Sequence, residues 1–161
     1  PAVREQTHKI HVHREALETY WSGGPRTLIH GDCHMGNLFF EGSEAGYFDW
    51  QVVQRGQGIR DISYFLTNSV TTELRRKAEE ELLDLSIQTL RIGGVSGDGV
   101  DPKWVWERYR AHCLYTSISS SVTAATPGLQ PVEVARAAMQ RSSAAIDDHQ
   151  ALGLLDEIIR R

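Results

Sequence analysis

A chain of 161 residues is long enough for one domain with a hydrophobic core, or for one lobe of a larger protein. Hydrophobic residues at 40% and charged residues at 24% are typical of soluble globular proteins, and the net charge of −4 gives no reason to expect nucleic acid or an anionic membrane as a partner. No apolar run approaches the roughly 18 residues that span a bilayer, and no leader segment is recognisable. The two cysteines, Cys33 and Cys113, lack metal-type spacing, so we expect a reducing cytoplasm.

Residues 3–21 contain no Pro or Gly and predict a first helix, because Ile10, Leu17 and Tyr20 recur at helical spacing. The segment 22–26, with two glycines and a proline, ends it. Three histidines lie on this helix without forming a tidy ligand face, so we interpret them as surface residues rather than a metal site: His8, His11 and His13.

A short strand over residues 27–30 leads into the most unusual stretch of the chain, HGDCHMGN at residues 30–37. Two further short strands, 38–40 and 47–48, flank a glycine-containing loop and predict a hairpin. Such a hairpin brings its two ends together. We therefore expect Asp32, Asn37 and Asp49 to converge on one small site.

The rest of the chain predicts helices. We expect a loop over 51–59, then helices over 60–70, 71–92, from Pro102 to about 122, 132–150 and 154–160, with a glycine-rich loop over 93–102. Asp101 is a candidate N-cap. The helix over 71–92 has one apparent apolar face, made of Leu74, Ala78, Leu82, Leu85 and Ile92. The predicted fold class is α+β, mainly α, with a small β-hairpin carrying the metal ligands, in a single domain over residues 1–161.

Two acids and an amide oxygen together suit a hard divalent cation, most naturally Mg²⁺, which completes its shell with water and substrate phosphates. A carboxylate free of the metal can deprotonate a hydroxyl nucleophile. Phosphoryl transfer is the natural reaction of such a set. A metallophosphoesterase is a poorer interpretation of the alternating His30, Asp32 and His34, because the further ligand clusters of those enzymes are missing downstream.

The segment HGDCHMGN, followed by FDW at residues 48–50, resembles the catalytic segment of the aminoglycoside phosphotransferase and choline kinase superfamily, which has a protein-kinase-like fold. The resemblance covers roughly residues 28–70. It implies Asp32 as the catalytic base, and Asn37 and Asp49 as ligands of the Mg²⁺ that bridges the phosphates of ATP.

The same resemblance implies supporting roles for residues near these three. His30 would be structural, and Asp61 would bind the backbone of the catalytic loop from the following helix. His34 would contact substrate or phosphate, or else serve as scaffold. Cys33 is expected to be a packing residue rather than a reactive thiol.

Kinases of this type grip ATP with an N-terminal lobe, and residues 1–26 read as one helix and a turn, so the resemblance covers the C-terminal lobe alone. We expect an ATP-dependent phosphotransferase acting on a hydroxyl of a small molecule (an aminoglycoside, an amino alcohol or a sugar-like compound), present here as a fragment. The alternative is a non-catalytic binding module. Self-association through a surface left by the missing lobe is a further possibility. Three acids of the C-terminal half either attract a cationic substrate or are solvated helix-end charges: Asp147, Asp148 and Glu157.

Overall fold

The computed structural model describes the backbone of residues 2–160 and the side chains of residues 4–160. Pro1 and Arg161, included in the predicted domain bounds, lie outside the described residues. The fold is mainly helical with two small antiparallel strand pairs, which confirms the predicted class. The helices are α1 (Ala2–Val12), α2 (Arg14–Ser22), α3 (Ile59–Tyr64), α4 (Thr72–Ile92), α5 (Pro102–Ala125), α6 (Val132–Asp148) and α7 (Ala151–Arg160). Short turns of 3-10 helix, η1 (Met35–Asn37) and η3 (Asp98–Val100), and of π-helix, η2 (Phe65–Ser69), join them.

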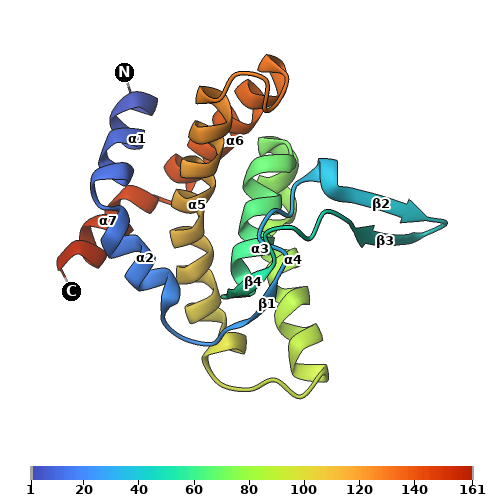
Figure 1. The fold of residues 1–161 in the computed structure, drawn as a ribbon. Coiled ribbons are helices and arrows are strands. Elements are labelled where there is room, and N and C mark those ends of the chain that lie inside the picture. The colour runs from blue at the N-terminus through green and yellow to red at the C-terminus, as the bar shows by residue number, and fades with distance from the viewer. Residues whose placement is uncertain (1, 161) are drawn as a thin grey trace.

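Helix α5 runs through the middle of the molecule, with α1, α2 and α7 on one side and α3 and α4 on the other (Figure 1). Its side chains enter two separate hydrophobic clusters. Ala111 and Leu114 pack with residues of α1, α2, α6 and α7, whereas Val105 and Tyr109 pack with residues of α3, η2 and α4. Asp101 caps its start, as predicted, by accepting a hydrogen bond of 2.7 Å from the Trp104 backbone nitrogen. A helix that is apolar on several faces is therefore central here.

The predicted first helix is divided into α1 and α2 at His13, whose backbone leaves the helical region (φ −103°, ψ 23°). The predicted apolar stripe is nevertheless correct, because Ile10 and Leu17 are fully buried in the first cluster and Tyr20 packs against it. His8 and His11 are exposed.

One strand was not predicted. β4 (Gln54–Gly56) pairs antiparallel with β1 (Thr27–Ile29), with Leu28 opposite Arg55. We expected a loop over 51–59 because Gln54, Arg55 and Gly56 carry no β-branched or apolar signal. The pairing follows instead from β1, which needs a partner for its backbone groups.

The hairpin β2 (Leu38–Glu41) and β3 (Glu44–Tyr47) projects away from the helical body (Figure 1). It confirms the predicted hairpin with slightly longer strands and a tighter loop. Among the described helices, none combines the length and the apolar character needed to cross a membrane.

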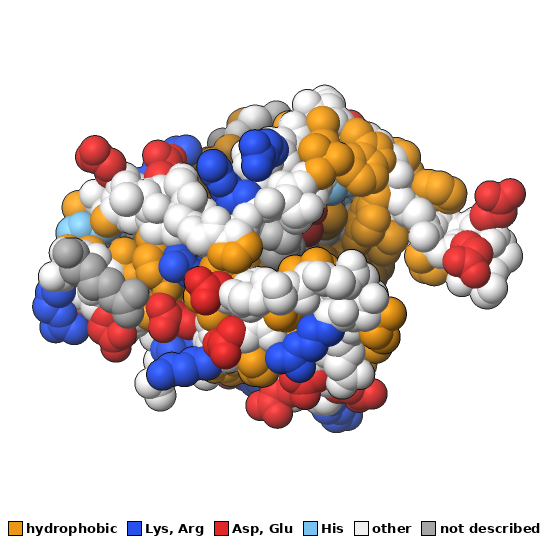
Figure 2. All heavy atoms as spheres, turned by 90° about the horizontal axis from the view of Figure 1, so that it is seen from below, with side chains coloured by type: hydrophobic (Ala, Val, Ile, Leu, Met, Phe, Trp, Pro, Cys, Tyr) orange, Lys and Arg blue, Asp and Glu red, His pale blue; other side chains and the backbone are white. Residues whose placement is uncertain are grey.

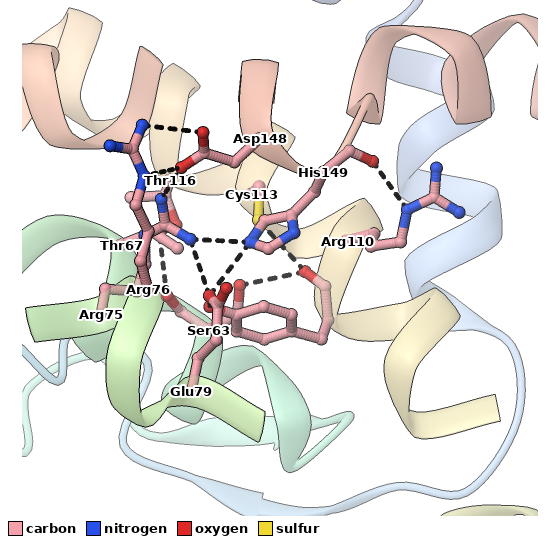
Figure 3. A network of polar contacts seen from close by, with 11 residues as sticks. Ser63, Thr67, Arg75, Arg76, Glu79, Arg110, Cys113, Thr116, Asp148 and His149 are labelled. Atoms are coloured by element: carbon pink, nitrogen blue, oxygen red, sulfur yellow. Dashed lines mark hydrogen bonds and ion pairs between the residues drawn. The ribbon is translucent and has the colours of Figure 1, made fainter. Parts of the chain in front are cut away.

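The predicted apolar face of α4 is wrong. Leu74 and Leu85 are each 56% exposed and Ile92 is 88% exposed, whereas the buried face consists of Arg75, Glu79, Leu83 and Ile87. The physical reason is a polar network in which Arg75 donates to a Glu79 oxygen at 2.7 Å and also binds Asp148. The other side chains of this polar network come from α5 and from the end of α6 (Figure 3).

This network gives the buried charges of Arg75 and Glu79 their hydrogen-bond partners. The Tyr109 hydroxyl donates to Glu79 Oε2 at 2.8 Å, and His149 Nε2 lies 3.0 Å from the same oxygen and 2.9 Å from Arg75. Burial opposes ionisation of Glu79, but hydrogen bonds from His149, Arg75 and Tyr109 outweigh it and lower the pKa of this carboxyl. The charge pair on α4 is thus held by partners from α5 and from the C-terminal end of α6.

The acids near the junction of α6 and α7 are structural in this fold. Asp148 binds Arg75 and makes two 2.8 Å contacts to Arg76, and Asp147 accepts a 2.7 Å hydrogen bond from Gln6. Two of the three acids considered for attracting a cationic substrate are therefore already engaged. Glu157 is exposed.

Candidate active site

The loop over residues 30–37 connects β1 to the hairpin, and His30 links its first residues to the segment that follows the hairpin. The His30 side chain is buried, its Nδ1 accepts a 3.2 Å hydrogen bond from the Asp32 backbone N–H, and its Nε2 lies 2.8 Å from the Phe48 carbonyl oxygen. Because Nδ1 accepts, Nε2 carries the proton and donates to Phe48. The imidazole ring also packs on Trp50, with centroids 4.6 Å apart. His30 thus connects the backbone of Asp32 to the residue that precedes Asp49.

The hairpin register brings Asn37 and Asp49 to the same end. Leu38 is paired with Tyr47, and the Phe48 N–H donates to the Asn37 carbonyl oxygen at 3.1 Å. Asp49 therefore follows directly after the residue opposite Asn37. Its side chain is exposed and its backbone has a φ of 62°, a left-handed conformation that is uncommon outside glycine and that Asp tolerates better than most residues.

Asn37 contacts Asp32 from the far end of the loop. The Asn37 side chain is 5% exposed, and its Nδ2 lies 3.0 Å from the Asp32 backbone oxygen and 3.5 Å from Asp32 Oδ2. The amide nitrogen is thus turned toward Asp32. Among the described residues, no hydrogen bond engages Asn37 Oδ1, so this oxygen remains available as an acceptor.

His34 lies beside the Asp32 carboxylate. His34 Nε2 is 3.6 Å from Asp32 Oδ2, and His34 Nδ1 accepts a 3.0 Å hydrogen bond from the Gly36 backbone N–H. The Gly36 contact caps the 3-10 turn η1 and makes Nε2 the protonated nitrogen that faces Asp32. The contact with the Gly36 N–H therefore gives His34 a structural role in the turn of the loop.

Asp61, on the first turn of α3, holds the start of the loop. Its Oδ2 accepts a 2.7 Å hydrogen bond from the His30 N–H, and its Oδ1 accepts one of 3.0 Å from the Gly31 N–H. The contact expected between Asp61 and the loop backbone is therefore present. Gly31 has a φ of +87°, and a Cβ there would meet the Val52 carbonyl oxygen at 2.7 Å, so glycine is required at this position.

A second anchor of the loop was missed from sequence. The Met35 backbone N–H donates to Ser69 Oγ at 2.9 Å, and Ser69 ends the π-helical turn η2. Arg141 of α6 in turn donates to the Asn68 and Ser69 carbonyl oxygens, each at 3.1 Å. The signal available in the sequence was a hydroxyl residue near the end of the predicted helix 60–70, but its partner lies 34 residues away.

Cys33 is a packing residue in the described structure. It is 4% exposed, and burial, together with the charges of Asp61 and Asp32, raises the pKa of its thiol to about 12. Tyr47 lies against it, and burial likewise raises the pKa of this phenol to about 12. A thiol in that environment stays protonated at neutral pH.

Hydrophobic side chains gather on the side from which the hairpin projects, with acidic side chains at the far end of the hairpin (Figure 2). The exposed large hydrophobic residues between positions 28 and 53 are Leu28, Met35, Phe39, Phe40, Phe48, Trp50, Val52 and Val53. Exposed apolar side chains in this number are typical of interaction surfaces.

Within residues 4–160, no three His, Cys, Asp or Glu side chains form a group that could hold a metal ion. The ligand set predicted here is smaller, with one amide, Asn37, and one carboxylate, Asp49. Such a set relies on water and substrate oxygens for the remaining positions around Mg²⁺.

Comparison with known proteins agrees with this geometry at the level of the family. The model of the ecdysteroid kinase-like family matches residues 4–91, which is more than half of the chain and includes the loop, the hairpin, α3 and α4. No curated protein and no solved structure gives a significant match. The chain belongs to the ecdysteroid kinase-like family, a family of protein-kinase-like phosphotransferases.

Proposed function

We propose that this chain carries the catalytic segment of an ATP-dependent phosphotransferase that transfers the γ-phosphate to a hydroxyl group of a small molecule. The observation that carries the proposal is the link from Asp32 through Asn37 to Phe48, made by the 3.0 Å amide contact and the 3.1 Å backbone hydrogen bond. This link supports the proposal because it joins Asp32, the proposed base, to Asn37 and to the residue before Asp49, the two proposed metal ligands. An aminoglycoside, an amino alcohol or a sugar-like compound would supply the hydroxyl.

In the proposed reaction, the Asp32 carboxylate accepts the proton of the acceptor hydroxyl. The hydroxyl oxygen forms a bond to the γ-phosphorus, the bond from that phosphorus to the bridging oxygen breaks, and ADP leaves. Asn37 and His34 hold the Asp32 side chain in place during this step, through contacts of 3.5 and 3.6 Å to its Oδ2. His30 and Asp61 fix the backbone that carries it.

The residues present fit Mg²⁺ as the cofactor. The Asn37 amide nitrogen is used by Asp32, which leaves the amide oxygen for a cation. The Asp49 carboxylate is exposed and directly follows Phe48, whose backbone is bonded to that of Asn37. Oxygen ligands of this type are the ones that Mg²⁺ prefers. When bound, the ion would neutralise charge on the phosphates of ATP.

Two variants separate the proposed roles. Asp32→Asn should lower turnover about 100-fold or more, because it removes the general base, while leaving the affinity for Mg·ATP nearly unchanged. Asp49→Asn should weaken Mg·ATP binding itself. Calorimetry with Mg·ATP and an ADP-release assay with a panel of hydroxyl compounds measure the two quantities.

Glu44→Gln, at the exposed start of β3, is the matched control, because it removes a carboxylate outside the proposed site. Near-normal turnover in both Asp variants would contradict the proposal. Tight, magnesium-dependent binding of ATP would exclude a binding module without catalysis.

A further inference from the structure

A cavity of about 460 Å³ lies between α2, β4, the start of α3 and α5. No residue of the loop 30–37 and no residue of the hairpin lines it, and Asp49 does not line it either. Its volume is in the range of pockets that hold small organic molecules rather than single ions. The proposed phosphotransfer makes no use of this cavity.

The cavity is strongly basic although the chain as a whole carries a net charge of −4. Four arginines line it: Arg14, Arg26, Arg55 and Arg60. Glu18 is the only carboxylate in its lining, and it is paired with Arg14 at 2.6 Å. In the described part of the chain, no ion pair engages the other three arginines. Three guanidinium groups around one cavity favour an anionic ligand.

One guanidinium is held in place and still has an unused donor. Arg60 binds the Tyr115 hydroxyl through one terminal nitrogen and lies over the Tyr115 ring at 3.9 Å. Its Nε is buried and makes no hydrogen bond. A buried donor without a partner costs free energy unless a ligand or water satisfies it.

His112, which also lines the cavity, has an unused acceptor. His112 is 1% exposed, and its Nε2 lies 3.0 Å from Gln57 Oε1. Since Gln57 Nε2 donates to the Gly23 carbonyl oxygen, Gln57 Oε1 is an acceptor and His112 Nε2 must donate to it. His112 Nδ1 is therefore an acceptor in the neutral ring, and it has no partner.

The neutral state of His112 is consistent with its surroundings. Burial, followed by the positive charges of Arg60 and Arg108, lowers the pKa of this imidazole well below its usual value. The Trp21 ring stacks on it with centroids 5.7 Å apart and fixes its plane. A ligand in this cavity meets three guanidinium groups, of which that of Arg60 is held in place, and one fixed acceptor.

We propose that this cavity binds a phosphate group that carries a hydrogen-bond donor of its own, as hydrogen phosphate or as the phosphomonoester of a small hydroxyl compound. The anionic oxygens pair with Arg26, Arg55 and Arg60, including the free Arg60 Nε. The P–OH or an alcohol hydroxyl donates to His112 Nδ1. Arg60 directly precedes Asp61, so an occupied cavity lies next to the residue that holds the His30–Gly31 backbone.

The first test is calorimetry with inorganic phosphate, glycerol 3-phosphate and sulfate at pH 6.5. Phosphate should bind several-fold more tightly than sulfate, because sulfate carries no proton to donate to His112 Nδ1. Tighter binding of glycerol 3-phosphate than of inorganic phosphate assigns the site to a phosphomonoester, and the reverse order assigns it to the free ion. No binding of either phosphate, or equal binding of sulfate, would overturn the proposal.

The double variant Arg26→Gln/Arg55→Gln should weaken phosphate binding about tenfold or more, because it removes two charge-assisted contacts from exposed side chains that the fold does not need. Arg136→Gln, an exposed arginine of α6 outside the cavity, is the matched control and should leave binding unchanged. Equal losses in the two proteins would show general electrostatic attraction and would refute a built site. None of these substitutions lies in the loop 30–37. A failure of the anion-binding proposal therefore does not affect the proposed phosphotransfer, and a failure of the proposed phosphotransfer does not affect anion binding.

Discussion

The Asp61 carboxylate lies 2.7 Å from the backbone nitrogen of His30, and through this contact α3 holds the start of the candidate catalytic loop. Its second oxygen binds the next backbone nitrogen, that of Gly31. Two consecutive N–H groups are thus satisfied by one charged side chain. Hydrogen bonds of this kind are roughly twice as strong as those between neutral groups.

Asp61→Asn should free this loop without unfolding the chain. The amide offers one oxygen in place of two and turns its N–H₂ group toward a donor, so we expect a loss of about 2 kcal/mol in the free energy of unfolding. Hydrogen exchange should become faster at the amides of His30 and Gly31. Mass spectrometry of the exchanged peptides measures this, with Asp84→Asn on the exposed face of α4 as the control. Unchanged protection at the two amides would show that Asp61 does not hold the loop.

The buried pair of Arg75 and Glu79 should be costly to break from one side. Glu79→Ala leaves the Arg75 guanidinium, whose side chain is 1% exposed, without its 2.7 Å partner, so we expect a loss of about 3–5 kcal/mol in the free energy of unfolding. The double variant Arg75→Met/Glu79→Leu should recover most of this loss. Chemical denaturation of the three proteins measures the difference. A double variant no more stable than Glu79→Ala would contradict this explanation.

The carboxyl groups of this network, Glu79 and Asp148, predict how the stability of the fold changes as pH falls. The folded-state pKa of Glu79 is lowered from its usual 4.5, and hydrogen bonds from Arg76, which outweigh burial, lower the pKa of Asp148 from 3.8. A lowered pKa in the folded state means that the stabilisation is fully present above the unfolded value and is lost as pH falls through the folded one. We therefore expect constant stability above about pH 5 from these groups and a decline below pH 4.5. Thermal melts from pH 6 to pH 3 measure it, and the decline should be shallower in Glu79→Gln.

Neither cysteine should react while the protein is folded. Burial raises the pKa of both the Cys33 and the Cys113 thiols to about 12, and the two side chains are 4% and 0% exposed. Iodoacetamide at pH 8 should leave both unmodified in the native protein and alkylate both in denaturant, as mass spectrometry can show. Rapid modification of Cys33 in the native state would instead mark it as an accessible thiol beside Asp32.

Gly31→Ala should destabilise the protein by about 2 kcal/mol, because the new methyl group meets the Val52 carbonyl oxygen and φ is positive. Gly42→Ala is the matched control, since Gly42 also has a positive φ (62°) but has open space around it. The difference between the two melting temperatures isolates the contact with Val52. Equal losses would assign the whole effect to the backbone conformation.

The candidate site could be predicted from the sequence because its residues are local. Asp32, Asn37 and Asp49 lie within 18 residues, and a hairpin is enough to bring their backbones together. The contact of Asp61 with the loop followed from the family resemblance, since its place in the first turn of a helix does not by itself indicate a partner. Ser69 was not, because its contact with Met35 depends on the π-helical turn η2, which changes where the end of that helix points.

The face of α4 shows why the rest could not be predicted. Leu74, Leu82 and Leu85 fit a helical period as well as Leu83 and Ile87 do, so periodicity alone does not choose between the two faces. The choice is made by His149 and Asp148, more than 70 residues away, which turn Arg75 and Glu79 into buried residues. The strand β4 was missed for a related reason, because its pairing with β1 is a backbone interaction that its polar side chains do not reveal.

The anchors of the loop have a consequence for the geometry of the site. Asp61 and Ser69 attach the loop to one continuous helical element, α3 and η2, at His30, Gly31 and Met35. The projecting hairpin, in contrast, is tied to the loop by the Phe48 backbone contacts to Asn37 and His30. Asp32 therefore belongs to a fixed part of the molecule, and Asp49 follows the hairpin strands, between Phe48 and Trp50, which both contact the His30 ring. One imidazole ring thus sets where the Asp32 backbone lies relative to Phe48, so the spacing of the two acids along the site depends on His30 rather than on the projecting hairpin.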